Sequence, residues 1–153
     1  MTKPTSPTKP WYSLEDQTIW IAGGAGYLGS AITKELDARG AKVVCFDLPG
    51  RAQAFVEENG LSGTIPHSLD LSDVEGIPAA IDAVIAAHGL PDGVVYLPTA
   101  SSRGRTLETL PAAEFQATFE RGLTPTFVFC RALAERMKER ETGAFVLYSS
   151  MYG

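Results

Sequence analysis

Cysteine and long hydrophobic runs are both scarce in this sequence. Only Cys45 and Cys130 occur in 153 residues, each inside an apolar run, which favours reduced, buried thiols and argues against a disulfide framework. No apolar stretch approaches the roughly 20 residues that a membrane helix requires. His67 and His88 have no cysteine or acidic partners at metal-ligand spacing, so we expect no metal site. These absences indicate a cytoplasmic protein without a membrane segment.

Positive charge is also in short supply. Lysine and arginine total 13 against 18 acidic residues, a net charge of -5, whereas a nucleic-acid surface needs clustered basic residues. The opening stretch MTKPTSPTKP is polar and lacks an apolar segment, so residues 1–12 are expected to be a disordered lead-in rather than a signal peptide. Residues 13–153 are long enough for one domain with its own core.

Five short apolar runs alternate with helical patterns in this domain. They predict strands over residues 17–22, 42–46, 63–69, 93–97 and 143–148. The crossovers are too long for hairpins, so we expect parallel strands with helices on both faces. Because such crossovers are right-handed, the predicted fold class is α/β, a doubly wound parallel sheet (Rossmann fold) of about five strands.

Helical spacing of apolar residues fills the segments between the strands. We expect a first helix through Leu28, Ile32 and Leu36 that stops at Gly40. A second helix is expected over 51–59, ending at Gly60, and a third from Asp73 to the stop signal Gly89. A longer helix before the last strand is expected to kink near Pro125, since proline lacks a backbone N–H. The residues expected in the core are Leu28, Ile32, Val44, Ile81, Val94 and Phe127.

The stretch IAGGAGYLGS directly after the first strand holds four glycines in seven residues. Gly24, Gly26 and Gly29 give G-x-G-x-x-G, and Gly23 adds G-x-x-G-x-x-G. Such spacing lets the chain turn sharply, lets the backbone approach a pyrophosphate and lets the helix pack close to the sheet, with the helix N-terminus facing the phosphates. The predicted dinucleotide-binding residues here are Gly23, Gly24, Gly26, Tyr27, Leu28 and Gly29.

Asp47 closes the second strand downstream of the glycines. An acidic residue at this place accepts from the ribose hydroxyls and repels a 2′-phosphate, which favours NAD over NADP. The alternative is a carboxylate that caps the helix over 51–59. Arg51 lies close by in sequence and could admit a 2′-phosphate, so NADP is not excluded.

From YSLEDQTIWIAGGAGYLGSAI to its last residue, the chain resembles the N-terminal part of a short-chain dehydrogenase/reductase. AGGAGYLG resembles the family's glycine fingerprint, in the spacing commoner in its sugar-nucleotide branch, with Ala22 where threonine is usual. LDLSD resembles the adenine-contacting pair, which falls on Asp70 and Leu71. The neighbouring Ser72 and Asp73 are expected to cap the next helix.

FVLYSSMYG resembles the family's fifth strand and the segment with its catalytic serine, which falls on Ser150, with Ser149 as second choice. Three departures stand beside this likeness. YLPTA replaces the Asn-Asn-Ala-Gly stretch, Gly122 stands at the position of the family's asparagine, and no Tyr-x-x-x-Lys follows Ser150. We therefore expect the domain to lack the family's C-terminal elements and to expose a sheet edge.

The resemblance implies an NAD(P)-dependent oxidoreductase that transfers hydride between nicotinamide and an alcohol or carbonyl substrate, possible substrates being sugars and sugar nucleotides. The Tyr-Lys pair that completes the reaction would lie outside these residues. Two alternatives stay open: a sugar-nucleotide epimerase or dehydratase, and a non-catalytic NAD-binding or partner subunit. The expected partners are a small-molecule substrate and a second chain, either another copy in a homo-oligomer or a subunit that supplies the missing half.

Overall fold

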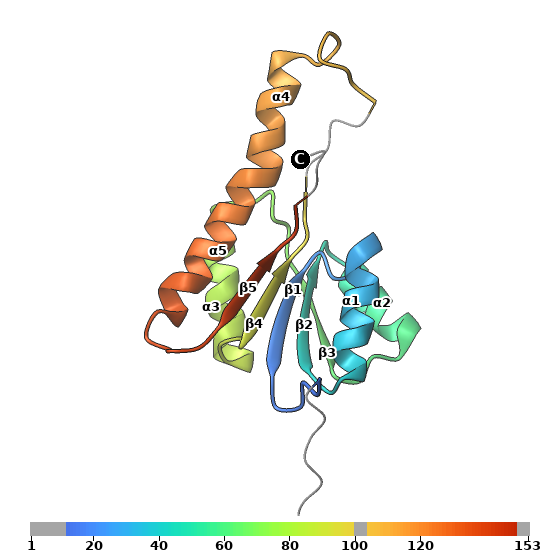
Figure 1. The fold of residues 1–153 in the computed structure, drawn as a ribbon, viewed down its shortest axis with the longest axis vertical. Helices are drawn as coiled ribbons and strands as arrows, with labels where there is room; N and C mark the ends of the chain where they lie inside the picture. The colour runs from blue at the N-terminus through green and yellow to red at the C-terminus, as the bar shows by residue number, and fades with distance from the viewer. Residues whose placement is uncertain (1–11, 100–103, 150–153) are drawn as a thin grey trace, which may run out of the picture.

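The computed structural model describes residues 12–99 and 104–149, and Figure 1 shows a central parallel sheet flanked by helices. The strands are β1 (Thr18–Ala22), β2 (Lys42–Asp47), β3 (Thr64–Ser68), β4 (Gly93–Tyr96) and β5 (Ala144–Leu147). They lie in the order β3-β2-β1-β4-β5, and every neighbouring pair is parallel. The predicted doubly wound sheet is therefore confirmed, with β1 at its centre.

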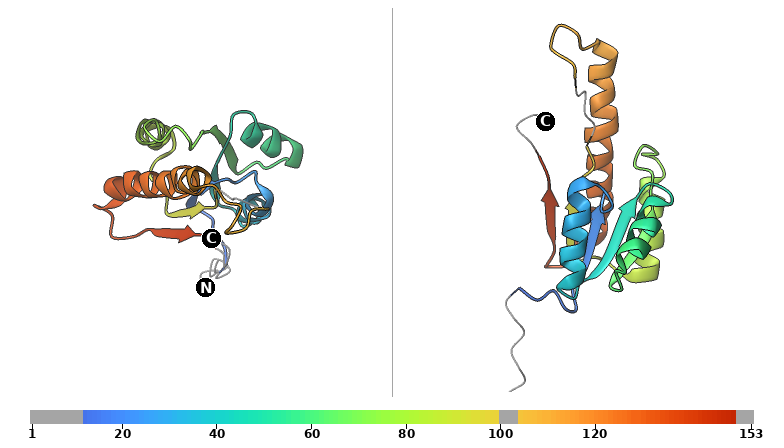
Figure 2. Two further views of the ribbon diagram at one scale, coloured as in Figure 1. Left: turned by 90° about the horizontal axis from the view of Figure 1, so that it is seen from above. Right: turned by 90° about the vertical axis from the view of Figure 1, so that its right-hand side faces the viewer.

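The helices are α1 (Tyr27–Ala38), α2 (Arg51–Asn59), α3 (Ile77–His88), α4 (Ala112–Thr118), the π-helical turn η1 (Phe119–Leu123) and α5 (Thr124–Met137). Helices α1 and α2 cover one face of the sheet, and α3 and α5 cover the other (Figures 1 and 2). Alternate residues of β1 show this division, because Trp20 joins the core under α3 and α5 while Ile21 joins the core under α1. No helix in the described part of the chain is both long and apolar enough to span a membrane.

Several predicted boundaries need correction. Helix α3 begins at Ile77 and not at Asp73, because Pro78 suits only the first turn of a helix, where its missing N–H costs nothing. The expected kink near Pro125 takes the form of the π-helical turn η1 just before that proline. Helix α4 has no buried residue and extends beyond the sheet (Figure 1).

Two expected core residues lie at the surface. Leu28 is 54% exposed and Phe127 is 57% exposed, whereas Val44, Ile81 and Val94 are buried as predicted. Leu28 is the second residue of α1, in its first turn. Phe127 is on the outer side of α5, where the Arg131 guanidinium lies 5.2 Å from its ring centroid. Ile32 is half-buried against the core under α1.

Strand β5 is an open edge in the described part of the chain. Its residues Phe145, Val146 and Leu147, and Tyr148 after it, are between 36% and 53% exposed. The two faces of the strand carry alternate members of this set, so neither face is fully covered. The sequence-based expectation of an exposed, apolar sheet edge agrees with this arrangement.

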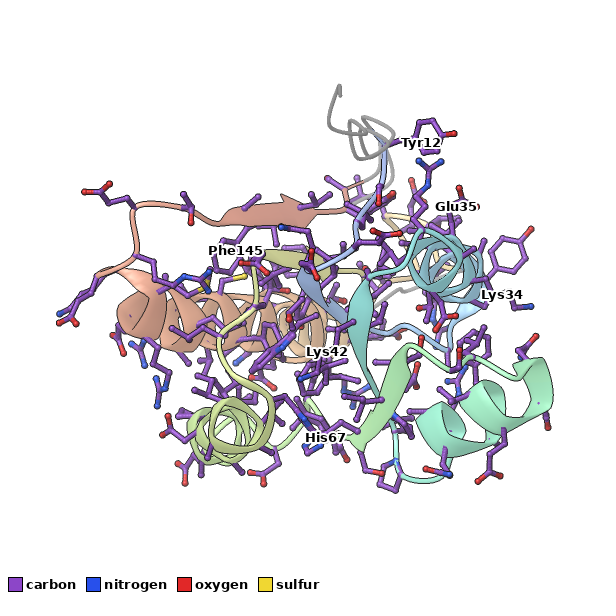
Figure 3. The ribbon with its side chains drawn as sticks, turned by 90° about the horizontal axis from the view of Figure 1, so that it is seen from below. Tyr12, Lys34, Glu35, Lys42, His67 and Phe145 are labelled. Carbon is purple, nitrogen blue, oxygen red and sulfur yellow. The ribbon has the colours of Figure 1, made fainter. Side chains whose placement is uncertain are left out.

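His67 lies on β3 (Figure 3). Its ring packs against that of Phe46, with centroids 5.3 Å apart. Burial, and secondly the charge of His88, lowers the pKa of His67. The unfolded chain therefore takes up this proton at a higher pH than the folded protein does. We expect the free energy of unfolding to fall as the pH drops below about 6.5, and His67→Gln to reduce that pH dependence. Urea unfolding at pH 7.5 and 5.5 measures it, and an unchanged pH slope in the variant would contradict this role.

Candidate nucleotide-binding site

The glycine loop connects the end of β1 to the start of α1. Gly23 adopts a left-handed conformation, φ +75°, which favours glycine. The backbone N–H groups of Gly23 and Gly24 donate to the carbonyl oxygen of Phe46 at 2.8 and 3.2 Å, and Gly26 N–H donates to the carbonyl of Gly23 at 3.0 Å. The loop is therefore pinned to the end of β2.

Two glycines are required because their surroundings leave no room for a side chain. A Cβ atom on Gly29 would lie 2.0 Å from the carbonyl oxygen of Gly23 and 2.8 Å from the Cα of Gly24. A Cβ on Gly24 would lie 2.6 Å from Sγ of Cys45 and 2.9 Å from Oγ1 of Thr33. The glycine spacing thus allows α1 to pack directly on the loop, as the sequence predicted.

Thr33 is a site residue that the sequence pattern did not single out. Its side chain is fully buried, and its hydroxyl donates to the carbonyl of Gly24 at 3.0 Å. The available signal was a polar residue one helical turn after Gly29, on the side of α1 that faces the sheet. Cys45 lies beneath the same loop, and burial raises the pKa of its thiol to about 12, so the thiol stays neutral.

The first turn of α1 leaves backbone donors at the carboxyl edge of the sheet. The helix begins after Gly26 with no side-chain cap and no acidic residue in its first turn, so the N–H groups from Tyr27 to Gly29 have no partner within the helix. Their dipoles give this end a partial positive charge, which suits a phosphate. Tyr27, 96% exposed, and Leu28 border the same position.

Asp47 lies against the glycine loop, with its side chain 6% exposed. Its Oδ2 accepts from the N–H of Ala25 at 3.0 Å, and its Oδ1 accepts from the N–H of Leu48 at 2.9 Å. It does not cap α2, because Gly50 holds the N-cap position without a side-chain hydrogen bond. The structure therefore brings Asp47 to the loop and removes the capping alternative.

Asp70 and Leu71 follow β3 at the same edge of the sheet. Asp70 is exposed, and its Oδ1 accepts from both the N–H and the hydroxyl of Ser72, which lowers the pKa of this carboxyl. Leu71 packs on the core beneath α3 and α5. The expected capping of α3 by Ser72 and Asp73 is wrong, since Gly76 is the N-cap and Asp73 only accepts from the N–H of Gly76 before the helix.

Ser150 lies outside the described residues, and Ser149 directly before it is exposed, two residues beyond the end of β5. In the YLPTA segment, Pro98 packs beside the loop, since a Cβ on Gly23 would lie 3.3 Å from its ring. Gly122 falls within η1, and its carbonyl accepts from the Thr126 hydroxyl at 2.7 Å. The region after β4 thus contacts the glycine loop through a proline ring, a contact that the sequence did not predict.

This combination of a parallel five-stranded sheet, a close-packed glycine loop and an uncapped helix N-terminus defines a Rossmann-type α/β domain. Residues 17–153 match the family model described as short chain dehydrogenase. The chain belongs to the short-chain dehydrogenase family, and this family assignment indicates a nicotinamide cofactor.

Relatives and solved structures agree with this assignment. The chain is 30% identical over 135 residues to a probable oxidoreductase EphD from Mycobacterium tuberculosis, covering 86% of this chain and 23% of the relative. It is 28% identical over 142 residues to a D-threitol dehydrogenase from Mycolicibacterium smegmatis, covering 91% and 54%. A short-chain type dehydrogenase/reductase from Mycobacterium ulcerans superposes with a TM-score of 0.81 at 25% identity, covering 91% and 53%. The chain thus spans about half the length of most of these relatives, and less of EphD.

Proposed function

We propose that this chain is the cofactor-binding part of an NAD-dependent oxidoreductase acting on an alcohol or carbonyl group of a small molecule. The observation that carries the proposal is the glycine loop, which leads into an α1 N-terminus without a side-chain cap and whose Ala25 N–H donates to the carboxylate of Asp47. The two relatives described above are named a probable oxidoreductase and a dehydrogenase, and these names support this function over an epimerase or a non-catalytic subunit.

The residues present fit a dinucleotide. The N–H groups from Tyr27 to Gly29 would hold the pyrophosphate, and the remaining lone pairs of Asp47 would accept from the ribose hydroxyls. Asp70 and Leu71, at the same edge of the sheet, would border the adenine. When bound, the nicotinamide supplies or accepts a hydride. The protein's own part at this end is to position the nucleotide.

Ser150 would hydrogen-bond the substrate oxygen. The family resemblance also implies a tyrosine and a lysine for proton transfer, and no Tyr-x-x-x-Lys follows Ser150 within these 153 residues. We propose that this pair and most of the substrate pocket come from elements beyond this sequence or from a second chain. The exposed apolar strand β5 supports this proposal, because it offers a surface for such elements.

Replacing Asp47 tests the preference for NAD. We expect Asp47→Ala to reduce the discrimination between NADH and NADPH by about tenfold, because the 2′-phosphate would no longer meet a carboxylate. Fluorescence titration with each nucleotide gives the ratio of dissociation constants, and Glu58→Ala, which removes an exposed carboxylate on α2, is the matched control. An unchanged ratio would contradict the role of Asp47, and a wild-type chain that binds neither nucleotide would contradict the proposed function itself.

A further inference from the structure

The backbone N–H and the carbonyl group of Ala25, at the centre of the glycine loop, each contact a side chain of the β2–α2 segment. Its N–H donates to Oδ2 of Asp47 at 3.0 Å, and the carbonyl oxygen of Ala25 accepts from Nη2 of Arg51 at 3.4 Å. The same guanidinium reaches Asp47, with 3.6 Å between Nε and Oδ1. One residue of the loop is thus enclosed by a carboxylate and a guanidinium that also contact each other.

The position of Arg51 follows from the turn before α2. Gly50 precedes it in a left-handed conformation, φ +80°, and the N–H of Arg51 donates to the carbonyl of Leu48 at 3.0 Å. Arg51 is therefore the first residue of α2, and its side chain extends back across the end of β2 toward the loop. Its planar fork presents donors to two acceptors in a fixed geometry, whereas the ammonium of a lysine is a compact charge on a flexible stem.

We propose that Arg51 is a positioning residue for the nucleotide site, which together with Asp47 fixes the backbone of Ala25 before the nucleotide binds. This inference rests on the proposed function of the loop. The guanidinium is already directed at Asp47 and at a loop carbonyl. Although its side chain is 55% exposed, it is engaged with the protein, and we therefore assign it to the loop and not to a 2′-phosphate. Arg51 contributes by ordering the loop, and this affects the binding of NAD and NADP equally because both nucleotides use the same loop.

This role predicts how Arg51→Ala changes binding. We expect the dissociation constants of NADH and NADPH to rise together by about fivefold, with their ratio unchanged, since an exposed charge contact of this kind contributes modestly. In the nucleotide-free protein, the Ala25 amide should exchange with solvent about fivefold faster by NMR. The Gly23 and Gly24 amides, which bond to Phe46, should keep their exchange rates. Arg51→Lys should behave like Arg51→Ala, and Arg131→Ala, an equal change of charge on α5, should alter neither quantity.

The outcomes separate this proposal from its alternatives. A selective loss of NADPH affinity would identify Arg51 as a phosphate ligand and overturn the proposal. An unchanged exchange rate of the Ala25 amide in Arg51→Ala would overturn it as well. Wild-type nucleotide affinity and a wild-type Ala25 exchange rate in Arg51→Lys would overturn the requirement for the planar fork, because a single positive charge would then suffice. If the wild-type chain binds no nucleotide, the proposed function fails, and the exchange rates alone still decide whether Arg51 orders the loop.

Discussion

Gly29→Ala is expected to weaken NADH binding by about 100-fold and to lower the free energy of unfolding. The new Cβ would lie 2.0 Å from the carbonyl oxygen of Gly23, so either the loop or the first turn of α1 must move by an ångström or more. Such a displacement would misalign the N–H donors for the pyrophosphate, and a 100-fold loss corresponds to about 2.8 kcal/mol, the scale of one or two hydrogen bonds to a charged group. Fluorescence titration with NADH and urea unfolding measure the two effects.

Helix propensity alone would predict the opposite sign for the change in stability. Gly29 is inside α1, where helix propensity alone favours alanine over glycine by about 1 kcal/mol. A more stable Gly29→Ala protein would therefore contradict the close approach of helix and loop. Gly60→Ala is the control: it places a methyl group at the left-handed C-cap of α2, where nothing lies within 4 Å. It should cost about 1 kcal/mol and leave NADH affinity unchanged.

The features that the sequence predicted correctly are those dictated by local chemistry. The parallel, doubly wound sheet follows from alternating apolar runs and helices, and the glycine loop follows from spacing that few other structures require. Helix α2 occupies the predicted residues 51–59 and ends at Gly60 in a left-handed conformation. In each case a short segment contains its own physical reason, so no knowledge of distant contacts is needed.

The features that were missed depend on where each element ends relative to its neighbours. Leu28 and Phe127 have apolar side chains at helical spacing, yet both are more than half exposed. Helical spacing alone does not show which of the apolar residues on a helix meet the sheet. Thr33 bonds to a loop nine residues earlier, and Pro98 packs on a glycine 75 residues before it in sequence. Such contacts arise only when the sheet is assembled.

The core beneath the loop also determines the geometry of the site, through Phe46. Its carbonyl accepts from the N–H groups of Gly23 and Gly24, while its ring lies at the centre of an aromatic cluster. The ring centroid is 5.2 Å from that of Trp20 and 5.9 Å from that of Phe129, and the side chain is 1% exposed. Packing of this ring therefore fixes the end of β2, to which the loop is bonded.

Phe46→Ala is accordingly expected to lower the free energy of unfolding by about 4 kcal/mol, because it opens a cavity among rings that cannot collapse around it. Urea unfolding at pH 7.5 measures the change. Phe46→Leu should cost about 1.5 kcal/mol and retain NADH binding, because the backbone carbonyl stays in place and most of the volume is kept. Phe115→Ala, on the exposed side of α4, is the control and should cost less than about 1 kcal/mol. A Phe46→Ala cost equal to that of Phe115→Ala would contradict a tightly packed cluster beneath the loop.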